Sequence, residues 1–216
     1  MQRGRFITLE GGDGTGKSTQ AGLLAGRLGE CGHRVVVTRE PGGSPFAEHL
    51  RRVLLRQGGD TTSRLAEALV FYAARADHLA TTIVPALDRG EWVICDRFAD
   101  STRAYQGAAG GLDEGALDTL EGLVVAGHWP DLTIILDLAP EIAHERRRRR
   151  ATADGAASGR DDPFESEGLA FHEKLRSAFL EIAAAYPARC HVVDAGLSER
   201  QVSEAIWEHL CRELAP

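Results

Sequence analysis

A glycine-rich run near the N-terminus has the residue types and spacing of a phosphate-binding loop, the P-loop. It fits the pattern G-x-x-x-x-G-K-[ST] and comprises Gly11, Gly12, Asp13, Gly14, Thr15, Gly16, Lys17 and Ser18. Glycines let backbone N–H groups turn inward around a phosphate, and the helix predicted to follow adds a favourable dipole. Lys17 is then placed to neutralise the β- and γ-phosphates, while the Ser18 hydroxyl can ligate Mg²⁺. We therefore expect this run to bind a nucleoside triphosphate whose terminal phosphate is transferred or hydrolysed.

Two adjacent charged residues, Asp96 and Arg97, follow a predicted buried strand. An aspartate in that position can organise the water shell of Mg²⁺, and an adjacent arginine can stabilise charge on a transferring phosphoryl group. Asp137 ends another predicted strand and is a competing candidate for the magnesium role. We favour Asp96 because Arg97 gives the pair a joint function, although either aspartate alone would equally suit a helix cap or a loop turn.

The elements that position these residues alternate between strands and helices. Short runs rich in β-branched residues predict five buried strands, at residues 6–9, 34–38, 92–95, 132–136 and 191–193. This alternation predicts an α/β fold with a doubly wound, parallel, five-stranded sheet flanked by helices, of the P-loop NTPase type. Ligands bind beyond the carboxyl ends of the strands in such sheets, which is where the P-loop, Glu40 and Asp96 are expected.

Apolar spacing and capping residues predict the helices around this sheet. Residues 63–87 are predicted to form one long helix. The residues spaced three or four apart on one of its faces are Leu65, Leu69, Tyr72 and Ala76. Ser198 and Gln201 have the spacing of a capping box, which predicts the start of the last helix.

The composition of the 216 residues excludes some classes of function. A formal net charge of -7 argues against a protein that binds duplex nucleic acid. No apolar run approaches the roughly 18 residues that span a membrane, and the four cysteines form no C-x-x-C pair, which suits a reducing cytosol. Asn does not occur, so the N-K-x-D loop by which regulatory GTPases read guanine is absent. We expect a single cytoplasmic domain over residues 1–216, with no nucleic acid and no membrane as partner.

One segment differs in composition from the rest. Residues 151–159 consist of Ala, Gly, Ser, Thr and Asp, show no apolar periodicity and follow a basic run at 146–150. We predict a small mobile flap, or lid, at about residues 146–163.

Together these motifs resemble those of the bacterial thymidylate kinases, a family of nucleoside monophosphate kinases. Besides the P-loop, the markers are T-R-E-P-G-G at 38–43, F-Y-A-A-R at 71–75, D-R-F at 96–98, S-T at 101–102 with A-Y-Q-G at 104–107, and F-E at 164–165 before F-H at 171–172. They follow the family's order over nearly the whole chain. The resemblance implies transfer of the γ-phosphate of ATP to dTMP, giving dTDP and ADP in dTTP biosynthesis. It also implies Mg²⁺ as cofactor and a homodimer.

The resemblance further implies which residues bind the base and sugar of dTMP. Phe71 would stack on thymine, and Arg75, one turn later on the same helix face, would donate to the base. A pure donor favours the carbonyl O4 of thymine over the amino group of cytosine. The remaining wall would consist of Ser101, Thr102, Tyr105 and Gln106. Without the other motifs, Phe71 would be interpreted as a core residue and Arg75 as a surface residue.

Residues near the phosphates are implied in the same way. Asp13 and Glu40 resemble family residues near the acceptor sugar and its phosphate, while Arg51 and Arg97 would grip the dTMP phosphate. In the bacterial subtype the lid supplies an arginine that the P-loop lacks. The lid candidates in this chain are Arg146, Arg148, Arg150 and Arg160. Pro163 stands where the family commonly has the lid arginine, so the choice among these candidates stays open, and a solvated basic helix face is the alternative for the run.

The predicted catalytic set is therefore Lys17, Arg97 and Asp96 with one lid arginine. Two other interpretations stay open on the sequence alone. One is a kinase for a different acceptor, such as another deoxynucleotide, and the other is a nucleotide-binding regulatory module without turnover.

Overall fold

The computed structural model describes residues 3–55, 63–153 and 168–216. Five parallel strands form one sheet in the order β2-β3-β1-β4-β5. The strands are β1 (Phe6–Glu10), β2 (Val35–Arg39), β3 (Trp92–Asp96), β4 (Leu132–Asp137) and β5 (Cys190–Asp194). Each lies within one residue of its predicted bounds, and the predicted fold class is confirmed.

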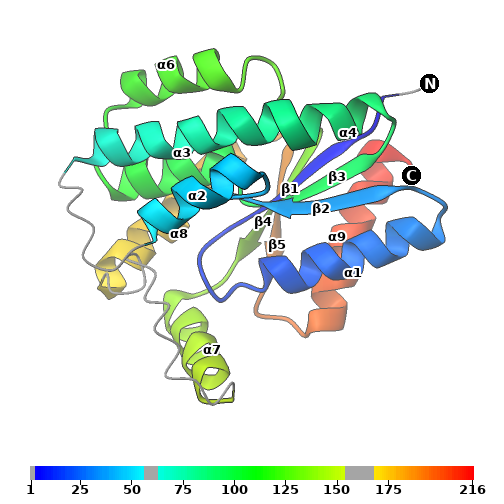
Figure 1. The fold of residues 1–216 in the computed structure, drawn as a ribbon. Helices are drawn as coiled ribbons and strands as arrows, with labels where there is room; N and C mark the ends of the chain where they lie inside the picture. The colour runs from blue at the N-terminus through cyan, green and yellow to red at the C-terminus, as the bar shows by residue number, and fades with distance from the viewer. Residues whose placement is uncertain (1–2, 56–62, 154–167) are drawn as a thin grey trace.

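Helices cover both faces of the sheet (Figure 1). One face packs against α1 (Lys17–Glu30) and α9 (Glu199–Leu214). The opposite face is covered by α3 (Arg64–His78), the π-helical segment η1 (Leu79–Ile83), α4 (Val84–Asp88) and α8 (Leu169–Ala185), with α6 (Glu114–Val124) on the outer side of α3. The elements that follow β2, β3 and β4 are α2 (Pro45–Leu54), α5 (Ala99–Thr102) with η2 (Arg103–Ala109), and α7 (Pro140–Ala153).

The strand side chains alternate between apolar layers, as parallel strands buried on both faces require. Ile7 and Leu9 of β1 pack with α1 and α9, whereas Phe6 packs with the elements of the opposite face. A further cluster joins Tyr105 of η2 and Phe179 of α8 to β4. These layers hold the carboxyl ends of the strands, where the P-loop and the loops after β2 and β3 begin.

The predicted long helix at 63–87 is present as three consecutive segments, α3, η1 and α4. Its predicted apolar face is not the buried one, because Leu65 and Leu69 are 45% and 49% exposed while Tyr72 is buried. The buried face of α3 instead includes the polar residues Arg75 and His78. Spacing of apolar residues could not reveal this face, because its polar side chains are buried by pairing with Glu40, a residue outside the helix.

The predicted capping box of the last helix is present at Ser198 and Gln201. The predicted flap at 151–159 begins too early, because α7 continues as helix to Ala153. The helix extends past the change in composition at residue 151 because alanine is a strong helix former. The rest of the predicted lid, from 154 to 163, lies outside the described residues.

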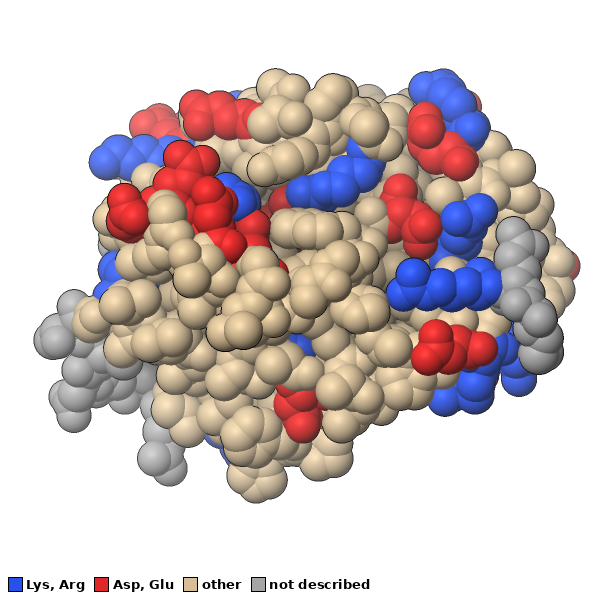
Figure 2. Space-filling model, turned by 90° about the horizontal axis from the view of Figure 1, so that it is seen from above, with Lys and Arg blue, Asp and Glu red and all other residues tan. Residues whose placement is uncertain are grey.

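Figure 2 shows the molecule from above, on the side of α6 and α3 in Figure 1. Charged side chains of both signs lie around a broad area in which few charged atoms are visible. Within the described parts of the chain, no helix combines the length and the apolar character needed to cross a membrane.

Candidate active site

The P-loop joins β1 to α1, in the predicted order of strand, loop and helix. Gly11, Gly14 and Gly16 have φ values of 129°, 83° and 96°, which L side chains rarely adopt. Within the loop, Thr15 Oγ1 donates a hydrogen bond to the Gly12 carbonyl at 2.9 Å. The backbone path therefore requires glycine at three positions of the motif.

Lys17 is the first residue of α1 and is only 6% exposed. Its Nζ donates to the carbonyl oxygens of Gly11 at 3.0 Å and Gly12 at 2.7 Å. Burial, followed by the charge of Arg97, lowers the pKa of Lys17 to about 8. A phosphate placed in the loop would favour the charged form of this amine, because it supplies an opposite charge in a desolvated setting.

Asp96 lies beside the P-loop serine, whereas Asp137 does not contact it. Ser18 Oγ donates to Asp96 Oδ2 at 2.5 Å. Asp137 accepts two hydrogen bonds from Arg176, at 2.7 and 2.8 Å. The hydroxyl and carboxylate of the Ser18–Asp96 pair are hard oxygen ligands, so these residues fit Mg²⁺. No cluster of three or more His, Cys, Asp or Glu side chains that could hold a metal occurs among the described residues.

Arg97 connects the loop after β3 to the P-loop. Its φ is 72°, in the left-handed region that non-glycine residues seldom occupy. Its guanidinium donates to the Gly11 carbonyl at 2.9 Å, Ser101 Oγ at 3.1 Å, Asp13 Oδ1 at 2.6 Å and Tyr105 Oη at 3.0 Å. Tyr105 Oη in turn donates to Asp13 Oδ2 at 3.0 Å. Five residues predicted for the site thus form one network.

Asp13 is held in its ionised form by this network. Burial alone would raise the pKa of Asp13, but the charges of Arg97 and Lys17 outweigh that effect and hold the pKa well below its usual value. A stable carboxylate at this point keeps the Arg97 guanidinium in place through a charge-assisted hydrogen bond.

Glu10, at the end of β1, binds residues that follow Arg97 and was not predicted as a site residue. It is fully buried, and it accepts the Phe98 N–H at 2.7 Å and the Ser101 hydroxyl at 2.5 Å. Burial, and then the negative charge of Asp100, raise the pKa of Glu10 to about 7. Both hydrogen bonds hold residues that follow Arg97, so they help to fix its left-handed backbone. The available signal in the sequence was a charged residue ending an otherwise apolar strand.

A cavity opens between the loops that follow β2 and β3. Nine of the ten residues predicted for the acceptor site line this acceptor cavity: Asp13, Glu40, Phe71, Arg75, Arg97, Ser101, Thr102, Tyr105 and Gln106. The tenth, Arg51 of α2, donates to the carbonyl of Pro41 at 2.7 Å, and Pro41 lines the cavity. Leu55 and Phe98 also line it and were not predicted.

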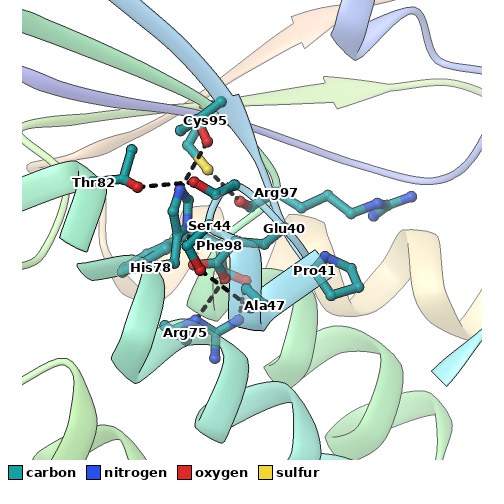
Figure 3. A network of polar contacts seen from close by, with 12 residues as sticks. Glu40, Pro41, Ser44, Ala47, Arg75, His78, Thr82, Cys95, Arg97 and Phe98 are labelled. Atoms are coloured by element: carbon teal, nitrogen blue, oxygen red, sulfur yellow. Dashed lines mark hydrogen bonds and ion pairs between the residues drawn. The ribbon is translucent and has the colours of Figure 1, made fainter. Parts of the chain in front are cut away.

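Arg75 of α3 lies in a buried polar cluster that forms one wall of the acceptor cavity (Figure 3). Its Nε donates to Glu40 Oε2 at 2.8 Å, and its Nη2 donates to the Phe98 carbonyl and to Thr102 Oγ1, both at 3.0 Å. His78 Nδ1 lies 3.0 Å from the other oxygen of Glu40. Arg75 is 1% exposed, and the charge of Glu40 overcomes the effect of burial and raises the pKa of Arg75. The guanidinium therefore stays charged and fixed.

Two buried nitrogen atoms of the acceptor cavity, Arg75 Nη1 and Gln106 Nε2, have no hydrogen-bond partner within the described part of the chain. Leaving a buried donor unpaired costs about 1–3 kcal/mol, so a ligand that supplies acceptors gains that free energy back. Phe71, on the same wall of α3, adds a partly buried aromatic ring. The cavity is thus suited to a flat ring that carries carbonyl oxygens, such as a pyrimidine base.

The predicted lid arginines that the structure describes lie along α7. Arg146 Nη1 donates to the carbonyl of Ala195 at 2.9 Å, and Arg148 pairs with Glu145 at 2.9 Å. The backbone of Arg150 belongs to α7. The side chain of Arg150 is not described. The other candidate, Arg160, and the proline that departs from the family pattern, Pro163, lie outside the described residues.

A second cavity, which we call the donor-side cavity, lies between the P-loop, the end of β4, α7 and α8. The P-loop contributes Gly11, Gly12, Asp13 and Thr15 to its lining, α7 contributes Ala143 and Arg147, and α8 contributes Leu175 and Arg176. Asp13 lines both this cavity and the acceptor cavity. The P-loop therefore separates two neighbouring binding spaces.

Comparison with known proteins gives a consistent result over the whole chain. The family model described as Thymidylate kinase matches residues 9–206. The thymidylate kinase of Nitrobacter hamburgensis is 50% identical over 210 residues, 97% of this chain and 89% of the relative. That of Caulobacter vibrioides is 50% identical over 214 residues, 99% of each chain. The crystal structure of thymidylate kinase from Ehrlichia chaffeensis superposes with a TM-score of 0.75 at 35% identity, covering 96% of this chain and 99% of the other.

Proposed function

This chain belongs to the thymidylate kinase family, and from that premise we propose that it binds ATP at the P-loop and dTMP in the acceptor cavity. The reaction is the transfer of the γ-phosphoryl group of ATP to dTMP, which gives dTDP and ADP. The observation that carries the assignment of residues is the Asp13–Arg97 ion pair at 2.6 Å, which joins the P-loop to the acceptor cavity. Asp13 lines both cavities and Arg97 lines the acceptor cavity, so the pair lies at the boundary between the two spaces.

The transfer needs no covalent enzyme intermediate. An oxygen of the dTMP phosphate forms a bond to the γ-phosphorus while the bond from that phosphorus to the β,γ-bridging oxygen breaks, and its electron pair leaves with ADP. Catalysis then rests on holding the two phosphates in line and on stabilising the spread charge. Lys17 would neutralise the β- and γ-phosphates from the P-loop, and Arg97 would contact the acceptor phosphate. Arg51 would approach that phosphate from α2.

Ser18 and Asp96 would hold Mg²⁺, whose charge would offset that of the β- and γ-phosphates. The carboxylate of Asp96 already accepts the Ser18 hydroxyl, so the two ligand oxygens are preassembled.

The thymine base would lie against Phe71, with its carbonyl oxygens toward Arg75 Nη1 and Gln106 Nε2. Thr102 and Ser101 complete this wall beside the base and sugar. Tyr105, which is held through its hydroxyl by Arg97 and Asp13, would lie against carbon 2′ of the deoxyribose. A fixed ring at that position leaves little room for a ribose hydroxyl, which favours deoxynucleotides.

A coupled assay of ADP release with dTMP, dUMP, dCMP, dGMP and dAMP tests this assignment. We expect the highest kcat/KM with dTMP and at least about a tenfold lower value with dCMP. The cytosine amino group is a hydrogen-bond donor and cannot accept from the donors of Arg75 and Gln106. Turnover with none of the five would contradict the kinase function. A preference for a purine would contradict the placement of the base on Phe71 and Arg75.

The family resemblance to dimeric kinases and the sparsely charged area in Figure 2 support a homodimer. Exposed leucines occur on the two helices of that side, with Leu69 of α3 49% and Leu123 of α6 76% exposed. Burying such side chains against a second copy is favourable by about 25 cal/mol per Å². Size-exclusion chromatography with light scattering should give twice the mass of one chain. Leu123→Glu should shift the population toward monomer. A monomer at micromolar concentration for the unchanged protein would refute the homodimer.

We also place the enzyme in the cytoplasm. All four cysteines are free thiols, two exposed and two buried, which suits a reducing compartment.

A further inference from the structure

His78 lies where α3 meets the loop that follows β2. Its side chain is fully buried, with an exposed fraction of 0%. Its Nδ1 lies 3.0 Å from Oε1 of Glu40, and its Nε2 lies 2.8 Å from Oγ1 of Thr38. Thr38 belongs to β2, and Glu40 is the first residue after that strand. An imidazole ring bound at both nitrogen atoms cannot rotate without breaking one of these contacts, so it holds the end of β2 against α3.

The carboxylate of Glu40 is shared between two residues of α3. Its Oε2 accepts from Arg75 Nε at 2.8 Å, and its Oε1 faces His78 Nδ1 (Figure 3). An ionised carboxylate can only accept hydrogen bonds, so Nδ1 of His78 is the donor in this contact. Arg75 and His78 are three residues apart, which places them on one face of the helix. Because both oxygens of Glu40 are bound, the carboxylate has one orientation and fixes the guanidinium of Arg75.

The turn that follows Glu40 packs on the same imidazole ring. Gly43 has a φ of 83°, and a Cβ atom added to it would overlap the ring of His78 and the hydroxyl of Thr38. Thr82, four residues after His78, donates from Oγ1 to the carbonyl of Gly43 at 2.8 Å. Pro41, at the start of this turn, lines the acceptor cavity. The position of that wall of the cavity therefore depends on the imidazole beneath the turn.

We propose that His78 is a positioning residue for recognition of the dTMP base. The proposal rests on the proposed function and adds a residue to it, because His78 is not among the described residues that line the acceptor cavity. It acts through Glu40, which holds Arg75 so that the unpaired Nη1 keeps its place in the cavity wall. The described contacts of His78 lie on the acceptor side. Its loss should therefore change KM for dTMP rather than kcat or KM for ATP.

Two amide variants of His78 separate its two contacts. The side-chain nitrogen of asparagine lies as many bonds from Cβ as Nδ1 does, and that of glutamine as many as Nε2. We expect His78→Gln to raise KM for dTMP, and to reduce the preference for dTMP over dCMP, by about tenfold each. Its kcat and KM for ATP should stay within about twofold. His78→Asn keeps a donor for Glu40, so its KM for dTMP should stay within about threefold. A KM for dTMP in His78→Gln within about twofold of normal, or equal to that of His78→Asn, would overturn the proposal.

Two further variants exclude an effect of lost stability. Thr38→Val replaces the hydroxyl that holds Nε2 by a methyl group of similar size, and it should raise KM for dTMP by about threefold. Leu210→Ala opens a cavity in the core on the other face of the sheet and destabilises the fold there. Its KM for dTMP should stay normal. An unchanged KM for dTMP in Thr38→Val, or a rise in Leu210→Ala as large as in His78→Gln, would overturn the role of the imidazole.

An NMR measurement on the ligand-free protein tests the same role without a substrate. The Nε–H of Arg75 donates to Glu40 from a side chain that is 1% exposed, so its hydrogen should exchange slowly with water. His78→Gln should speed this exchange by at least about tenfold, and His78→Asn should speed it less. Slow exchange retained in His78→Gln would overturn the action through Glu40. Faster exchange in a protein that does not phosphorylate dTMP would support the role of His78 and contradict only the proposed function.

Discussion

Replacing Lys17 by Ala should lower kcat by about 100- to 1,000-fold, because it removes a fixed charge from the phosphates in the transition state. The amine is desolvated, with a pKa lowered to about 8, so it remains mostly protonated at neutral pH. Water cannot replace the lost positive charge, because the Lys17 side chain is only 6% exposed. The measurement is kcat with saturating dTMP and a titration of ATP.

The chain contains one other lysine, Lys174, which is exposed on α8 and provides the matched control. Lys174→Ala should retain full activity. Binding of dTMP alone to Lys17→Ala should be unchanged, since Lys17 does not line the acceptor cavity. A Lys17→Ala enzyme with more than about a tenth of the normal kcat would show that the P-loop amine is not the main charge on the donor phosphates.

Replacing Arg75 by Met should affect both folding and recognition of the base. The change leaves the carboxylate of Glu40 buried without its strongest partner, which costs about 3–5 kcal/mol of the free energy of unfolding. It also removes the unpaired donor that we propose to face a thymine carbonyl, so kcat/KM for dTMP should fall by about 10- to 100-fold. Chemical denaturation and the five-nucleotide assay measure the two effects.

The double variant Arg75→Met with Glu40→Gln separates these effects. Removing both charges should restore much of the stability, because no unpaired charge remains buried, while kcat/KM for dTMP should stay low. Arg89→Met breaks an exposed ion pair with Glu91 and should leave the free energy of unfolding nearly unchanged, because solvent screens such pairs. Recovery of normal discrimination between dTMP and dCMP in the double variant would show that Arg75 only stabilises the fold.

The strands and the P-loop could be predicted because their signals are local. Runs such as 92–95 are apolar and β-branched, and the glycine pattern at 11–18 specifies both the backbone path and the chemistry. Asp96 could be preferred over Asp137 on the identity of its neighbour, and the structure brings Asp96 to Ser18. In each of these cases the deciding information lies within a few residues.

The remaining features depend on partners that are distant in sequence. The buried face of α3 could not be read from apolar spacing, because Arg75 is buried by its ion pair with Glu40, 35 residues away. Glu10 could not be assigned because its hydrogen-bond donors follow β3, about 90 residues later. Contacts with residues distant in sequence bury these side chains, and a local sequence pattern does not indicate such contacts.

Asp13 belongs to the walls of both cavities and is bound to Arg97 and Tyr105 of the acceptor side. A ligand that displaces this carboxylate on one side therefore alters the surroundings of the ligand on the other. The affinities for donor and acceptor are in that case thermodynamically linked, and each must change the other's by the same factor. Under that condition the two substrates would act as effectors of one another through the shared aspartate.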